Sequence, residues 1–170
     1  YLLGEWEFFG LPFFVGEGVL IPRADTEVLA TLPAREWACG CGEVAKTALI
    51  DGDEFFFWLP DQASAVVDRQ PDAVSEVIAR CVVFKADVVA QDKTESRGVR
   101  ECLNYGHTLA HAIEKLSGYG TYSHGHAVAE GMRFAARMGM RLADMPVELA
   151  QAQGQLLDDL GLPELGWEAS

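Results

Sequence analysis

The spacing of apolar residues and helix breakers after Pro33 constrains the fold more than any other feature of this sequence. Apolar side chains recur there about every 3.6 residues, the period of an amphipathic helix, and Gly or Pro separates one segment from the next. The pattern predicts helices over residues 34–50, 52–58, 72–90, 98–117, 124–143 and 146–160. We therefore expect a mainly α fold, with one helical domain over residues 31–170.

Residues 1–30 follow a different pattern. Aromatic and β-branched residues are frequent there, and Gly or Pro interrupts them at short intervals, which is typical of strands and turns. A chain of 170 residues suits one domain with a small addition. We expect a short β-rich N-terminal appendage ahead of the helical domain.

Charge and composition exclude several classes of partner. The 26 acidic and 13 basic residues give a net charge of −13, which repels the phosphates of nucleic acids. No stretch approaches the roughly 20 apolar residues of a membrane span. There is no secretory leader, and the four cysteines form neither a disulfide framework nor a zinc-knuckle spacing. We expect a cytoplasmic protein that binds neither nucleic acid nor membrane. The absence of an initial methionine is typical of a fragment.

The predicted helix over residues 98–117 carries an unusual polar face. The face consists of Arg100, Asn104, His107 and His111, at positions i, i+4, i+7 and i+11. Solvated helix faces usually carry Glu and Lys, whereas a guanidinium, an amide and two imidazoles can bind an anion and a metal together. The alternative is a polar surface stripe that happens to hold two histidines.

The histidines favour the metal-binding interpretation. His124 and His126 follow at the start of the next predicted helix, so all four histidines lie within 20 residues. Such clustering indicates a divalent metal of the zinc kind. Thr108 follows His107, so the His-Glu-x-x-His pattern of zinc proteases is missing and protease chemistry is disfavoured.

A lysine interrupts the apolar face of the predicted helix over residues 72–90. Lys85 shares that face with Val74, Ile78, Cys81, Val82, Val88 and Val89. Burying an ammonium group without an anion costs desolvation energy, so Lys85 either reaches out to solvent or faces a binding site. The spacing alone favours solvent.

Four segments together resemble the C-terminal half of the 3-dehydroquinate synthases. They are GEVAKTALIDGDEFFFWL (Gly42–Leu59), FKADVVAQD (Phe84–Asp92), LNYGHTLAHAIE (Leu103–Glu114) and SHGHAVAEGM (Ser123–Met132). The resemblance implies a carbon–oxygen lyase of the shikimate pathway. Enzymes of this family remove phosphate from a seven-carbon keto-acid phosphate and close its ring, with bound NAD and a zinc or cobalt ion.

The resemblance also implies a role for each site residue. The metal ligands would be Glu43, His107 and His124. The substrate carboxylate would meet Arg100, and the phosphate would meet Asn104 and His111. Catalytic residues beside the substrate hydroxyls would be Lys46, Lys85 and Glu95. Ala110 stands where the family usually has glycine.

Residues 1–30 contain no glycine-rich strand–turn–helix unit that could hold NAD, which the family binds in an N-terminal α/β domain. Residues 1–29 instead resemble the protein-(glutamine-N5) methyltransferases that modify release factors, without that family's donor loop or Asn-Pro-Pro-Tyr motif. We hypothesise a chimera joined at Asp25–Leu29.

We therefore expect a metal-binding helical domain, a homodimer by the resemblance, with negligible synthase activity as an isolated chain. One alternative is half of a related sugar-phosphate cyclase that needs a partner chain. The other is a non-catalytic helical interaction module, in which the histidine face is polar surface and no metal binds.

Overall fold

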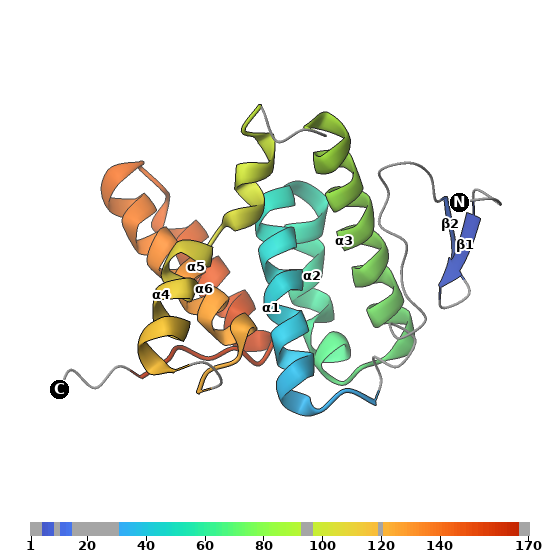
Figure 1. Cartoon of the computed structure of the whole chain (residues 1–170), viewed down its shortest axis with the longest axis horizontal. Coiled ribbons are helices and arrows are strands. Elements are labelled where there is room, and N and C mark those ends of the chain that lie inside the picture. Colours follow the sequence, from blue (N-terminus) through green and yellow to red (C-terminus); the bar gives the residue numbers. More distant parts are fainter. Residues whose placement is uncertain (1–4, 9–10, 15–30, 93–96, 119–120, 167–170) are drawn as a thin grey trace.

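The computed structural model describes residues 5–8, 11–14, 31–92, 97–118 and 121–166 (Figure 1). The α-helices are α1 (Ala34–Asp51), α2 (Asp53–Val67), α3 (Pro71–Gln91), α4 (His107–Ser117), α5 (His124–Leu142) and α6 (Val147–Asp159), and a 3-10 helix, η2, spans Val99–Asn104. The prediction of a mainly α fold is confirmed. No helix in these ranges is long and apolar enough to cross a membrane.

Two short strands precede the helices. Strands β1 (Glu5–Phe8) and β2 (Leu11–Phe14) pair antiparallel, with Glu5 opposite Phe14 and Phe8 opposite Leu11. The remainder of residues 1–30 lies outside the described part of the chain, so the expected β-rich appendage stays a prediction. The junction expected at Asp25–Leu29 also falls outside it.

The helices form two groups that meet at α1 and α5. Figure 1 shows α1, α2 and α3 side by side, with α4, α5 and α6 on the other side of α1. The core consists mainly of small and aliphatic side chains. Its fully buried members include Ala45, Ala48, Leu59, Ala110, Ala127, Val128, Met132, Leu157 and Leu162. Small residues on α1 and α5 allow these two helices to pack closely.

Local signals account for several helix boundaries. Gly52 has φ +71°, which a glycine adopts without steric cost, and it separates α1 from α2. Pro71 occupies the first turn of α3, where its missing N–H has no intrahelical role. The Ser123 side chain accepts a hydrogen bond from the His126 N–H and caps α5.

The predicted end of the second helix at residue 58 is wrong. Helix α2 continues through Pro60 to Val67. Proline removes one intrahelical hydrogen bond, but Pro60 lies on the exposed face, while Leu59, Ala63 and Val66 remain buried at helical spacing. Burial of that apolar face stabilises the helix more than the lost bond weakens it.

The prediction of one helix over residues 98–117 is also wrong. The chain forms η2, leaves helical geometry at Tyr105 and turns through Gly106, whose φ is +80°. Gly106 packs against α5, and an added Cβ at Gly131 would overlap the Gly106 carbonyl oxygen. The chain therefore leaves helical geometry at Tyr105 and Gly106, where it passes close to α5. Residues on η2 and α4 therefore do not share one helical face.

Candidate metal centre

Three side chains from three helices converge on one point. Glu43 lies on α1, while His107 and His124 are the first residues of α4 and α5. One possible ligand atom from each residue lies within 4.8 Å of the other two. The Nε2 atoms of both histidines are 3.8 Å from Oε1 of Glu43. A carboxylate and two imidazoles form a donor set that suits zinc and related divalent metals.

Close helix crossings produce this convergence. A Cβ added at Gly42 would lie 2.8 Å from the Gly125 Cα, and one added at Gly125 would lie 2.5 Å from the Cys39 carbonyl oxygen. Both distances are far shorter than ordinary van der Waals contact, so the backbones of α1 and α5 touch directly. Glu43 and His124 are the sequence neighbours of these glycines. The glycine contacts therefore bring their side chains to the same place.

The two carboxylate oxygens of Glu43 differ in their surroundings. Oε2 accepts a hydrogen bond of 2.7 Å from Nζ of Lys46, whose side chain is only 8% exposed. Oε1 is buried, and within the described residues no hydrogen-bond donor reaches it, although the side chain as a whole is 44% exposed. A buried carboxylate oxygen without a donor is costly. The space between Oε1 and the two imidazoles fits a bound cation.

Both histidines present the same nitrogen to this space. Nδ1 of His107 donates to the Tyr105 carbonyl at 3.2 Å, and Nδ1 of His124 donates to Oε1 of Glu114 at 3.1 Å. A proton on Nδ1 leaves a lone pair on Nε2, which is the form that binds a metal. Burial is the main cause that lowers the pKa of His107, so its neutral, ligating form is favoured near neutral pH.

The other two histidines stand outside the group of three. His111 is exposed on α4, and its ring lies edge-on to that of His107 at 5.7 Å between centroids. Nδ1 of His126 is 2.7 Å from Oγ of Ser123, which is itself the cap of α5. Helical spacing alone would pair His107 with His111.

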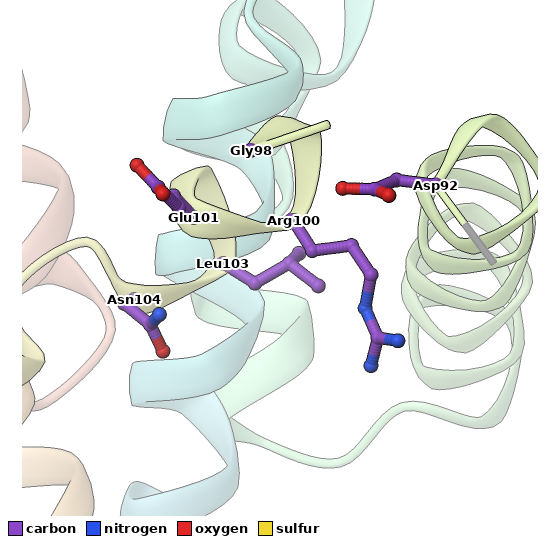
Figure 2. Close-up of a pocket in the computed structure, with 6 residues that line it drawn as sticks. All are labelled: Asp92, Gly98, Arg100, Glu101, Leu103 and Asn104. Carbon is purple, nitrogen blue, oxygen red and sulfur yellow. The ribbon is translucent and has the colours of Figure 1, made fainter. Parts of the chain in front are cut away.

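A separate pocket holds two of the predicted substrate residues. It has a volume of about 360 Å³ and is lined by Asp92, Gly98, Arg100, Glu101, Leu103 and Asn104 (Figure 2). In Figure 2 the Arg100 side chain extends from η2 toward α3, the Asp92 carboxylate points from the end of α3 toward η2, and Asn104 lies at the other end of η2. Asp92 is buried, and its carboxylate accepts the backbone N–H groups of Arg97 and Val99 at 3.1 Å. These bonds connect the end of α3 to the start of η2.

The remaining predicted catalytic residues occupy different surroundings. Lys46 contacts the Glu43 carboxylate directly, as described above. Lys85 is exposed on α3. Glu95 lies outside the described residues. The position of Lys85 agrees with the solvent-facing interpretation that its spacing favours.

One site residue was missed at the level of sequence. Glu114 contacts His124, and it lies seven positions after His107 on the same face of α4. That spacing was visible in the sequence. Its partner on α5 was not, because the pairing depends on how α4 packs against α5.

A family model for the C-terminal part of 3-dehydroquinate synthase matches residues 40–169. The chain belongs to this family. Among 3-dehydroquinate synthases, the enzyme of Dehalococcoides mccartyi is 46% identical over 140 residues, covering 82% of this chain and 38% of the relative. The enzyme of Acidithiobacillus ferrooxidans is 48% identical over 143 residues, covering 84% and 39%. The chain thus spans well under half the length of these synthases.

Solved structures agree with this family assignment. A crystal structure of 2-deoxy-scyllo-inosose synthase matches with a TM-score of 0.69 at 34% identity, covering 89% of this chain and 42% of that one. A crystal structure of the same enzyme complexed with carbaglucose-6-phosphate, NAD+ and Co2+ also has a TM-score of 0.69, at 33% identity, with 89% and 41% coverage. The helical part of this chain therefore has the architecture of a cyclase C-terminal domain.

Proposed function

We propose that the chain is the metal-binding part of a 3-dehydroquinate synthase-type carbon–oxygen lyase. In that reaction phosphate leaves a seven-carbon keto-acid phosphate and the product closes to a carbocycle. The observation that carries the proposal is the donor group of Glu43, His107 and His124, with ligand atoms within 4.8 Å of one another. Membership of the synthase family supports it.

The proposed metal is Zn2+ or Co2+, held by the Glu43 carboxylate and the Nε2 atoms of His107 and His124. Three protein ligands leave a coordination position open for substrate hydroxyls, as in catalytic zinc sites. A bound dication supplies Lewis acidity that polarises a substrate oxygen. Lys46, whose ammonium group lies 2.7 Å from Glu43, would orient that carboxylate and contact the substrate hydroxyls.

The proposed anion contacts come from η2 and α4. Arg100 would bind the substrate carboxylate, a task suited to a planar guanidinium that can donate two parallel hydrogen bonds. Asn104 and His111 would meet the phosphate. Lys85 and Glu95 are proposed to approach the ring hydroxyls, as the sequence resemblance implies.

The NAD of the family does not fit the described residues. They contain one antiparallel strand pair and no parallel βαβ unit of the kind that holds a dinucleotide. The proposed role of the helical domain is to bind the metal and the substrate, and the redox part of the reaction would need a dinucleotide site outside these helices.

Metal content tests the proposal. After dialysis, the purified chain should retain about one Zn2+ or Co2+, and the variant His107→Ala/His124→Ala should retain none. His126→Asn is the matched control, because it changes a histidine two positions from His124 that is outside the group of three. An equal metal content in the double variant and the wild type would contradict the proposed ligand set. Absence of metal from the wild type would favour the non-catalytic interaction module.

A second candidate is a related cyclase half that acts on another sugar phosphate with a partner chain. The match to 2-deoxy-scyllo-inosose synthase favours it. The two candidates differ when an NAD-binding partner chain is supplied. Phosphate release from a seven-carbon keto-acid phosphate supports the synthase, and release from a hexose phosphate supports the related cyclase.

We also propose a pathway, a compartment and an oligomeric state for the protein. The synthase role would place the protein in the shikimate pathway of the cytoplasm, as a homodimer.

Residues 1–29 are proposed to derive from a methyltransferase of the release-factor family, joined at Asp25–Leu29. A contiguous read of the encoding DNA with an intact synthase start upstream of Thr31 would contradict the chimera.

A further inference from the structure

We infer that Glu114 is a positioning residue for the metal centre, because its carboxylate orients the His124 imidazole. This inference rests on the proposed metal site. Oε1 of Glu114 lies 3.1 Å from Nδ1 of His124. A carboxylate can only accept in such a bond, so Nδ1 carries the proton and donates it.

The bond determines which nitrogen His124 offers to a metal. With the proton on Nδ1, the lone pair lies on Nε2, which is 3.8 Å from Oε1 of Glu43. The Glu114 side chain is 18% exposed, against 39% for His124. The better-buried partner therefore restrains the more exposed ring. An imidazole that donates to a carboxylate is also a more basic ligand.

His107 shows why His124 needs this partner. Its Nδ1 is held by a backbone carbonyl, that of Tyr105, and its own side chain is only 16% exposed. Backbone and burial together restrain the His107 ring. The His124 side chain is 39% exposed, and its Nδ1 meets a carboxylate side chain instead of a backbone carbonyl.

Helix α4 supplies both His107 and Glu114. His107 begins the helix, and Glu114 follows it two turns later on the same face, which packs against α5. One face of α4 thus provides a proposed ligand and the orienting group of a second ligand. The Glu114 carboxylate also adds negative charge beside the site, which favours a bound dication.

The test measures metal affinity in the whole chain. Co2+ binding is followed by its visible absorption, and Zn2+ binding by competition with a coloured chelator. Glu114→Ala should weaken binding by about 10- to 100-fold, as removal of such partners typically does. The metal affinity of Glu114→Gln should lie between those of the wild type and Glu114→Ala, because the amide oxygen still accepts a hydrogen bond from Nδ1 but has no charge. Unchanged far-UV circular dichroism establishes that each variant is folded.

Glu76→Gln is the control. It removes a carboxylate that pairs with Arg80 at 2.7 Å on the exposed face of α3, and it should leave the affinity unchanged. If the wild type binds metal and both Glu114 variants bind within threefold of it, the inference is overturned and the proposed function stands. If the wild type binds no metal, the proposed function is overturned and this inference with it.

Discussion

The two carboxylate oxygens of Glu43 lie in different surroundings. One oxygen is bonded to Lys46, and the other is buried between two imidazoles without a donor. Lys46 is itself almost fully buried, so the Glu43 carboxylate compensates the desolvation of its ammonium group. The bond to Lys46 holds the carboxylate in place and leaves its second oxygen for a cation.

His126 contributes to the pH dependence of stability. Burial is the main cause that lowers its pKa below 6.5, and the charges of Arg35 and Arg133 act in the same direction. The unfolded chain therefore takes up this proton at a higher pH than the folded chain does. The contribution of His126 to stability is complete above about pH 6.5 and is lost as the pH falls through the folded-state pKa.

The variant His126→Asn tests the direction of this change in stability with pH. Asparagine can still bond to Ser123 but cannot titrate. In urea unfolding of the metal-free chain, the free energy of unfolding should fall less between about pH 8 and pH 5 in the variant than in the wild type. His107 is present in both chains, so the difference reports on His126. An equal or steeper fall in the variant would contradict the assignment.

At the scale of elements, the crossing of α4 and α5 depends on glycine. Gly131 faces the backbone of Gly106 with no room for a side chain. Gly131→Ala should lower the free energy of unfolding by about 3 kcal/mol or more, because backbone rather than a flexible side chain must move. The same shift would displace His107, so metal affinity should fall too. Chemical denaturation and Co2+ titration measure the two effects.

Gly154→Ala is the matched control for that variant. Gly154 lies inside α6, and a Cβ added there meets nothing within 4 Å. Alanine favours helix over glycine, so this change should raise the free energy of unfolding by up to about 1 kcal/mol. If Gly131→Ala also raised the free energy of unfolding, as expected for Gly154→Ala, the close approach at Gly106 would not restrict the residue at position 131.

At the scale of the whole molecule, the chain spans 38% of the Dehalococcoides mccartyi relative and 39% of the Acidithiobacillus ferrooxidans relative. The described helices hold the proposed metal and substrate residues but no dinucleotide fold. We expect the purified chain to show no NAD-dependent phosphate release from the seven-carbon substrate, even when it is loaded with metal. Positioning and electrostatic contributions from a dinucleotide domain have no substitute in these helices.

A phosphate-release assay with a full-length synthase as positive control measures this activity. Release from the chain above that of the His107→Ala/His124→Ala variant would contradict the expectation. If the chain binds metal but releases no phosphate, the proposed metal site assembles in this chain without supporting the reaction.

The helical class was predictable from the sequence because helix formation depends on residues three and four positions apart, which the pattern after Pro33 displays directly. Helix ends were less predictable. Whether Pro60 ends a helix depends on how much apolar surface continues beyond it, and whether Gly106 breaks one depends on the helix packed against it. Both answers come from tertiary contacts.

The site divides in the same way. The sequence by itself determined that all four histidines lie between residues 107 and 126, and its resemblance to the synthases indicated Glu43 as a distant partner of two of them. The same resemblance implied His107 and His124 as the other members, and only the tertiary structure shows how closely the three meet, with possible ligand atoms within 4.8 Å of one another. Helical spacing relates residues within one element. The meeting of α1, α4 and α5 depends on backbone contacts at glycines that are far apart in the chain.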